Sequence, residues 1–173
     1  MREILRSAVA LFEKNQISAV DAEILLAHVL GVSRKQLITS TFELPADEVE
    51  RVNDEFKGLV EQRLLGKPVQ YITGSAPFRY LDLEVGEGVL IPRPETELLV
   101  DRAIGFLSSA EDKDVAKSVV DLGAGSGAIS IAIATEATLK NLKVSVVAVD
   151  SLVSTGAEVA SVGAAADAAA DLV

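Results

Sequence analysis

Hydrophobic residues in the first third of the chain recur three and four positions apart, the spacing of amphipathic helices. Ser18 followed by Asp21 fits a capping box at the start of a second helix, and Gly31 suits the left-handed residue that ends it. Further residues that typically begin or end helices follow at Ser33, Pro45 and Gly66. Residues 1–66 are therefore predicted to form a small helical bundle.

The pattern changes after residue 66. Residues 67–93 combine alternating polar and apolar positions with aromatic residues and turn-forming Gly and Pro, which predicts a β-hairpin whose clearest strand is Phe78–Val85. The segment PRPETELLVDRAIGFL then returns to helical spacing, and Pro94 suits the first position of that helix. A hairpin linker is thus expected between the helical bundle and a further folded part.

Residues 117–150 have the pattern of a strand, a turn, a helix and a second strand. KSVVDL and VSVVAVD are short apolar runs typical of buried strands, and AISIAIATEA between them is helical. Two parallel strands joined by a helix predict a right-handed crossover and an α/β sheet. The remainder, residues 151–173, is an atypical tail rich in alanine, with few side chains large enough to pack.

Composition narrows the classes of function. The chain of 173 residues has 26 acidic and 16 basic side chains, and this net charge of −10 opposes direct binding to nucleic acid. It has no cysteine, which excludes disulfides, and a single histidine, His28. With so few potential ligands and bases, most zinc sites and Ser-His-Asp catalytic triads are also excluded. His28 is expected to be half-buried in the second helix. We expect no metal and no membrane contact, in a cytoplasmic protein.

The candidate chemistry lies in the turn after the first parallel strand, where three glycines alternate. Glycine there allows positive φ and close approach of a ligand, and the start of the next helix favours a carboxylate or phosphate. Asp150 ends the second strand, where an acid can accept hydrogen bonds from ribose hydroxyls. A tight turn without a ligand is the alternative. The candidate cofactor-binding residues of the turn are Asp121, Gly123, Ala124, Gly125, Ser126 and Gly127.

The type of nucleotide is indicated by the spacing of this loop. Dinucleotide sites favour G-x-G-x-x-G, whereas the present sequence is D-x-G-x-G-x-G. The additional acid before the first glycine fits a ligand that carries an ammonium group beside a carboxylate. The methionine portion of S-adenosylmethionine has both groups, but the glycines alone leave the choice open.

Several segments together resemble the PrmC/HemK family of protein-(glutamine-N5) methyltransferases. The segments GKPVQYITG, FRYLDLEV, VLIPRPETELLV and VVDLGAGSGAISIAIA occur in the family's order and at its spacings. The resemblance covers residues 1–150 and implies a helical domain that engages the release factor, followed by a class I methyltransferase domain. It implies that S-adenosylmethionine is bound at the glycine loop and Asp150, and that the substrate is the glutamine of the GGQ motif in peptide chain release factors. Three further residues would border the cleft: Arg93, Glu95 and Thr96.

The catalytic element that the resemblance implies, Asn-Pro-Pro-Tyr, does not occur in this sequence. In the family it follows a later strand and orients the glutamine amide, whose delocalised lone pair is a poor nucleophile. We therefore expect a truncated or frame-shifted form that lacks the catalytic residues and is inactive by itself. The expected fold is α/β, with an incomplete Rossmann-like domain.

The predicted parts are residues 1–66 (helical domain), 67–93 (hairpin linker), 94–150 (start of the cofactor-binding domain) and 151–173 (tail). Two alternatives to a release-factor methyltransferase stay open. One is a non-catalytic module that only binds a release factor. The other is a relative of the adenine amino-methyltransferases, which share the loop but are disfavoured by the acidic charge and the IPRPETE segment.

Overall fold

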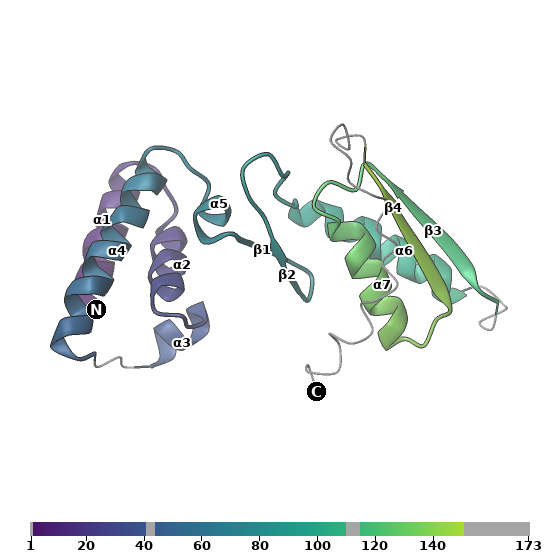
Figure 1. The fold of residues 1–173 in the computed structure, drawn as a ribbon, viewed down its shortest axis with the longest axis horizontal. Coiled ribbons are helices and arrows are strands. Elements are labelled where there is room, and N and C mark those ends of the chain that lie inside the picture. The colour runs from purple at the N-terminus through teal and green to yellow at the C-terminus, as the bar shows by residue number, and fades with distance from the viewer. Residues whose placement is uncertain (1, 41–43, 110–114, 151–173) are drawn as a thin grey trace. The chain divides into compact units, whose positions relative to one another are not determined.

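The computed structural model describes residues 2–40, 44–109 and 115–150, and the predicted tail lies outside these residues. The chain divides into two compact units, one ending at Gly74 and the other beginning at Ser75 (Figure 1). The first unit is helical and the second contains the strands. Each unit has its own hydrophobic core. The structure therefore places the change between units within the segment that the sequence predicted as a linker.

The helical unit contains the helices expected from the hydrophobic spacing and one more. Its elements are α1 (Arg2–Lys14), α2 (Ala19–Val29), α3 (Arg34–Thr39), α4 (Ala46–Leu64) and α5 (Val69–Thr73). The short α5 was predicted as part of the hairpin, which is wrong. Pro68 stands at its N-cap, and Val69 is 7% exposed in the core of the unit. Packing of Val69 therefore overrides the strand-like composition of this segment.

Two predicted caps have different outcomes in the structure. Ser18 is the N-cap of α2, but its side chain accepts from the Val20 N–H, and the Asp21 carboxylate instead pairs with Arg63 Nε of α4 at 2.7 Å. The predicted capping box is therefore wrong, because a long-range ion pair takes the acid. Gly31, at φ +63°, has the left-handed conformation expected after α2.

The core of the helical unit is formed by inward-facing residues from all of its helices. Phe12, Leu25 and Leu26 are fully buried, and Val52 and Phe56 of α4 pack with them. His28 lies in α2 as predicted, but its side chain is exposed, so the expected half-buried position is wrong. The reason is that the buried side of α2 is centred between Leu25 and Leu26, with Ala22 one turn earlier, and His28 lies outside it.

The second unit begins with the predicted hairpin. Strands β1 (Ser75–Phe78) and β2 (Leu81–Glu84) pair antiparallel, with Phe78 opposite Leu81 and the turn at residues 79–80 between them. The predicted strand Phe78–Val85 therefore contains the turn itself. Arg79 has φ +54°, a left-handed conformation that the sequence pattern does not signal.

The α/β part of this unit follows the predicted order. A short 3₁₀ turn (Pro94–Thr96) leads into α6 (Glu97–Ser109), and β3 (Lys117–Leu122), α7 (Ala128–Leu139) and β4 (Val144–Val149) complete it. The strands β3 and β4 are parallel, with Asp121 opposite Ala148. This confirms the predicted strand-helix-strand arrangement, in which α6 and α7 lie along the strand pair (Figure 1).

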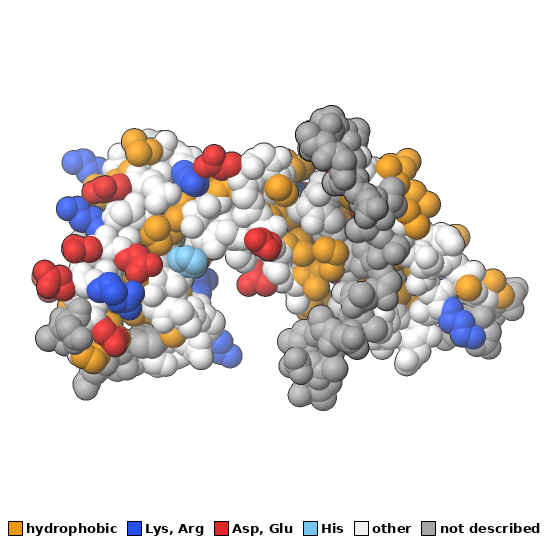
Figure 2. Space-filling model, in the orientation of Figure 1, with side chains coloured by type: hydrophobic (Ala, Val, Ile, Leu, Met, Phe, Trp, Pro, Cys, Tyr) orange, Lys and Arg blue, Asp and Glu red, His pale blue; other side chains and the backbone are white. Residues whose placement is uncertain are grey.

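The strand pair is packed on one face in the described part of the chain. Val146 of β4 is 4% exposed and packs against residues of α6 and α7. On β3 alternate residues are exposed, including Val120 at 58% and Leu122 at 77%. The prediction of a fully buried strand is therefore wrong for β3. In the view of Figure 2, charged side chains intermingle over the helical unit, whereas hydrophobic side chains gather in patches on the second unit.

None of the helices that the structure describes has the length and apolar character needed to cross a membrane.

Candidate cofactor-binding site

The glycine loop connects β3 to α7 through a tight turn with several left-handed residues. Gly123, Gly125 and Gly127 have φ values of +78°, +55° and +75°. The Gly123 N–H donates to the Val149 carbonyl at 2.7 Å, and the Gly127 N–H donates to the Ala124 carbonyl at 2.8 Å. Because L side chains rarely adopt such φ values, the alternation of glycines is what allows this turn.

The structure brings Asp150 to this loop. Asp150 directly follows β4, and its Oδ2 accepts a hydrogen bond from the Gly125 N–H at 2.6 Å. The parallel register places Val149 opposite Leu122, so the end of β4 lies beside the start of the loop. Two segments that are far apart in the sequence therefore meet at one end of the strand pair.

Asp121 is fixed at the same end of the strand pair by a residue that the sequence did not single out. The hydroxyl of Ser130, in the first turn of α7, donates to Asp121 Oδ2 at 2.6 Å. Ser130 is fully buried, whereas Asp121 is half-buried. Within the described residues Asp121 has no cationic partner. A half-buried carboxylate without a cation favours a positively charged group nearby.

The space around the loop fits a ligand that approaches the backbone. A Cβ atom added to Gly123 or Gly125 would meet no heavy atom of the described residues within 4 Å, so both glycines border space that these residues leave open. The N-cap of α7 is Gly127, and no side chain of the described residues caps this end of the helix. Uncapped N–H groups at a helix start favour a carboxylate, and Asp121 favours an ammonium group. This donor set therefore fits the amino-acid portion of S-adenosylmethionine.

The residues predicted to border the cleft lie just before α6, in and beside the 3₁₀ turn. Arg93 and Glu95 are exposed, Thr96 is half-buried, and the Thr96 N–H donates to the Arg93 carbonyl at 3.0 Å. Among the described residues, no hydrogen bond or ion pair joins their side chains to the glycine loop. Their position at the cleft stays a prediction.

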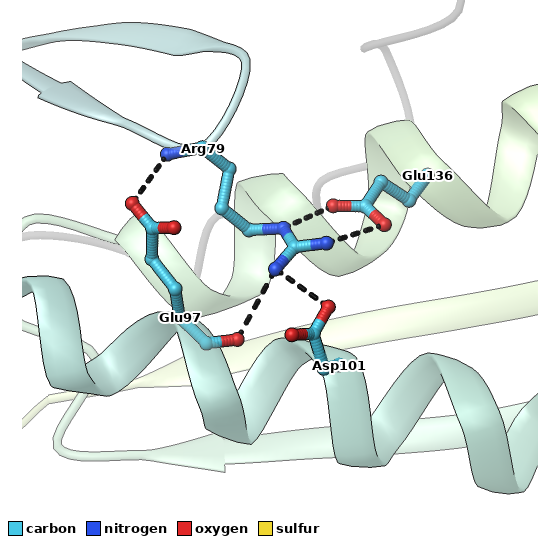
Figure 3. Close-up of polar contacts among 4 residues, drawn as sticks. All are labelled: Arg79, Glu97, Asp101 and Glu136. Atoms are coloured by element: carbon cyan, nitrogen blue, oxygen red, sulfur yellow. Dashed lines mark hydrogen bonds and ion pairs between the residues drawn. The ribbon is translucent and has the colours of Figure 1, made fainter.

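An ion-pair network that the sequence analysis missed joins the hairpin to both helices of the second unit (Figure 3). The Arg79 guanidinium donates to both carboxylate oxygens of Glu136 in α7, and its Nη1 lies 2.8 Å from Asp101 Oδ1 in α6. The Arg79 N–H donates to Glu97 Oε1 at 3.0 Å, and Nη1 donates to the Glu97 carbonyl at 3.2 Å. One side chain therefore connects β1–β2, α6 and α7.

The side chains of Arg79 and Glu136 in this network are largely shielded from solvent. Side-chain exposure is 11% for Arg79 and 9% for Glu136, although Asp101 is 59% exposed. The hydrogen bonds from Arg79 to Glu136 raise the pKa of the guanidinium further above its ordinary value, and they outweigh the opposing effect of burial. A sequence signal existed for this network, because Glu136 is the one charged residue in the segment AISIAIATEA.

A separate groove lies in the helical unit, between α1 and α4. Its volume is about 460 Å³, and its lining includes Leu11, Asn53, Phe56 and Lys57. Asn53 Oδ1 is buried and has no hydrogen-bond partner in the part of the chain that the structure describes. A buried acceptor without a donor is unfavourable, so Asn53 is a point of local instability beneath the groove. Among the described residues, no three potential metal ligands gather in one place.

The chain is similar to known proteins in both units. Residues 3–74 match the family model of the PrmC N-terminal domain. The release factor glutamine methyltransferase of Burkholderia pseudomallei is 44% identical over 130 residues, which are 75% of this chain and 43% of that protein. Proteins of the same name from Chlorobaculum tepidum and Haemophilus influenzae are 41% and 40% identical over 136 and 139 residues. These matches cover 76% and 78% of this chain and 45% and 47% of those relatives.

The parallel strands, the glycine loop and the crossover helix are the beginning of a class I methyltransferase domain, preceded by a hairpin and a helical unit. With the matches to the N-terminal domain and to these relatives, the chain belongs to the PrmC/HemK family. It spans less than half of the length of these relatives, with 43% to 47% of each aligned.

Proposed function

We propose that the chain provides the release-factor-binding and cofactor-binding parts of a protein-(glutamine-N5) methyltransferase. The reaction is methylation of the side-chain amide of the GGQ glutamine in a peptide chain release factor, with S-adenosylmethionine as methyl donor. The observation that carries the proposal is the pair of aspartates at the open glycine loop, of which Asp121 has no cationic partner among the described residues.

Each part of the loop has a separate role in this proposal. Asp121 accepts from the ammonium group of the cofactor, and the uncapped start of α7 binds its carboxylate. The residues Gly123 to Gly127 let the ligand approach the backbone, since Gly123 and Gly125 border open space. Asp150 lies at the loop through Gly125 and accepts from the ribose hydroxyls. Arg93, Glu95 and Thr96, in and beside the 3₁₀ turn before α6, border the cleft.

The helical unit binds the release factor, and the groove between α1 and α4 is its contact surface. An apolar side chain of the release factor would lie against Leu11, which is 40% exposed in the lining of the groove. The contact is between proteins, in keeping with the net charge of −10, which opposes direct binding to nucleic acid.

The chain by itself does not supply the step of methyl transfer in this proposal. Asn-Pro-Pro-Tyr is absent from the sequence, and none of Asn15, Asn53 and Asn141 precedes a proline. Without groups that orient the amide lone pair, the reaction loses about two orders of magnitude or more. Binding of the cofactor and of the release factor are the functions that these residues can perform.

A chimera tests the whole proposal. Residues 1–150 of this chain are joined to the C-terminal part of the Burkholderia pseudomallei relative, and the chimera is incubated with labelled S-adenosylmethionine and an unmodified release factor. Mass spectrometry should detect a methyl group on the GGQ glutamine, and Asp150→Ala should abolish it. Transfer to RNA or DNA instead of the release factor would contradict the proposed substrate and favour an adenine amino-methyltransferase. Binding of release factor without any cofactor binding would leave only a non-catalytic module.

A further inference from the structure

A fully buried serine lies directly behind the proposed cofactor site. Ser130 is in the first turn of α7 and has no exposed surface, while other buried residues of the same helix, such as Ala132 and Ile133, are apolar members of the core. Serine is a weaker helix former than alanine, and a buried hydroxyl without a partner is unfavourable. Among the described residues its hydroxyl bonds to Asp121 alone, and that hydrogen bond offsets the cost of burying it.

That hydrogen bond engages only one of the two carboxylate oxygens. Ser130 Oγ donates to Asp121 Oδ2 at 2.6 Å, the short length typical of a hydroxyl that donates to an ionised carboxylate. Asp121 Oδ1 has no hydrogen-bond or ion-pair partner among the residues that the structure describes. The buried serine thus fixes the rotation of the carboxylate and leaves the other oxygen available to a ligand.

We propose that Ser130 is a positioning residue for the ammonium group of the cofactor, through Asp121. The inference rests on the proposed function, because it assigns the free oxygen of Asp121 to that ammonium group. Ser130 itself does not touch the ligand. Its hydroxyl holds the carboxylate in one orientation before binding, so that less conformational freedom is lost when the cofactor binds.

The binding of two ligands distinguishes a positioning role of Ser130 from a merely structural role. S-adenosylhomocysteine carries the ammonium and carboxylate groups, whereas 5′-methylthioadenosine has the same nucleoside and lacks both. We expect Ser130→Ala to weaken calorimetric binding of S-adenosylhomocysteine about tenfold, or ~1.4 kcal/mol, and to leave that of 5′-methylthioadenosine unchanged. Thr138→Ala removes a hydroxyl from the exposed part of the same helix and should change neither affinity.

A double-mutant cycle tests whether Ser130 acts through Asp121. In Asp121→Asn the serine has lost its charged acceptor, so adding Ser130→Ala should cause no further loss of S-adenosylhomocysteine affinity. Equal weakening of both ligands by Ser130→Ala, or losses that add in the double variant, would overturn the inference. Circular dichroism confirms folding, and Ser130→Cys, which keeps the size with a weaker donor, replaces the alanine variant if that one unfolds.

Ligand binding by the unaltered chain distinguishes a failure of the role of Ser130 from a failure of the proposed function on which that role rests. If the unaltered chain binds both ligands and Asp121→Asn weakens neither, the cofactor site stands and the role of Ser130 is wrong. If the unaltered chain binds neither ligand at millimolar concentration, the proposed function fails, and the role of Ser130 fails with it.

Discussion

The guanidinium of Arg79 and the carboxylate of Glu136 form a two-point ion pair between residues 57 positions apart. Arg79 is in the turn of the β1–β2 hairpin, and Glu136 is in α7, the helix that begins at the glycine loop. The pair therefore connects the hairpin with the element that forms one side of the candidate cofactor site. Because both side chains are largely buried, neither can exchange its partner for water without a loss of stability.

We expect Arg79→Ala to destabilise the second unit by about 3 kcal/mol, because it leaves the Glu136 carboxylate buried without a partner. Chemical denaturation followed by circular dichroism measures the free energy of unfolding. Arg51→Ala is the matched control, since the Arg51–Glu55 pair in α4 is exposed and should contribute about 0.5 kcal/mol or less. Equal losses in the two variants would mean that the Arg79 network contributes no more than a surface pair.

The glycine loop is expected to be sensitive to a single methyl group. Gly125 has φ +55°, so Gly125→Ala introduces backbone strain of about 1 kcal/mol and places a methyl group in the open space beside the loop. Calorimetric titration with S-adenosylmethionine should show that the affinity falls by about tenfold or more.

Gly58→Ala is the control for this substitution. Gly58 lies within α4, and an added Cβ meets no heavy atom within 4 Å. Because alanine favours helix over glycine, this variant should stabilise the helical unit by about 0.5–1 kcal/mol and leave cofactor affinity unchanged. A similar loss of affinity in both glycine variants would argue against a ligand at the loop.

The helical unit is expected to fold without the rest of the chain, and its end can be tested. Its core includes Val69 of α5, so residues 1–74 should be more stable than residues 1–66 by about 2 kcal/mol. Thermal unfolding of the two fragments, followed by circular dichroism, measures the difference. Limited proteolysis of the full chain should yield the longer fragment. Cleavage inside α1 and α2 as fast as in residues 151–173 would contradict independent folding.

The groove between α1 and α4 gives a prediction for release-factor binding. Leu11→Asp places a charge in the apolar lining, so binding should weaken about tenfold in a pull-down or calorimetric titration. Ile38→Asp on α3 is the matched control, because Ile38 is 58% exposed and lies outside the lining of the groove. If the two substitutions have the same effect, the release factor contacts another surface.

The chain alone is expected to bind S-adenosylmethionine at least about tenfold more weakly than a complete relative, and to transfer no methyl group to a release factor. The physical reason for the second expectation is the absence of Asn-Pro-Pro-Tyr. Mass spectrometry of the release factor after incubation measures transfer. Turnover above background that disappears in Gly125→Arg would mean that the chain carries another device for orienting the amide.

The hydrophobic spacing and the punctuating residues determined most of the elements. The helical spacing of apolar residues and the capping residues predicted α2 and α3. The alternation of glycines after an apolar run predicted the turn between β3 and α7. These signals are local, because each depends on residues within one or two turns of chain. The resemblance of ordered segments then indicated the family without any knowledge of contacts.

Only the tertiary structure decided which polar residues meet. Asp21 was assigned to a local cap, but Arg63 from α4 takes its carboxylate. The sequence analysis did not single out Arg79 or Ser130, because their partners Glu136 and Asp121 come from other elements. A sequence pattern specifies the face that a side chain occupies, whereas the choice of partner depends on the distance between elements after packing. That distance is fixed only when the cores of the two units form.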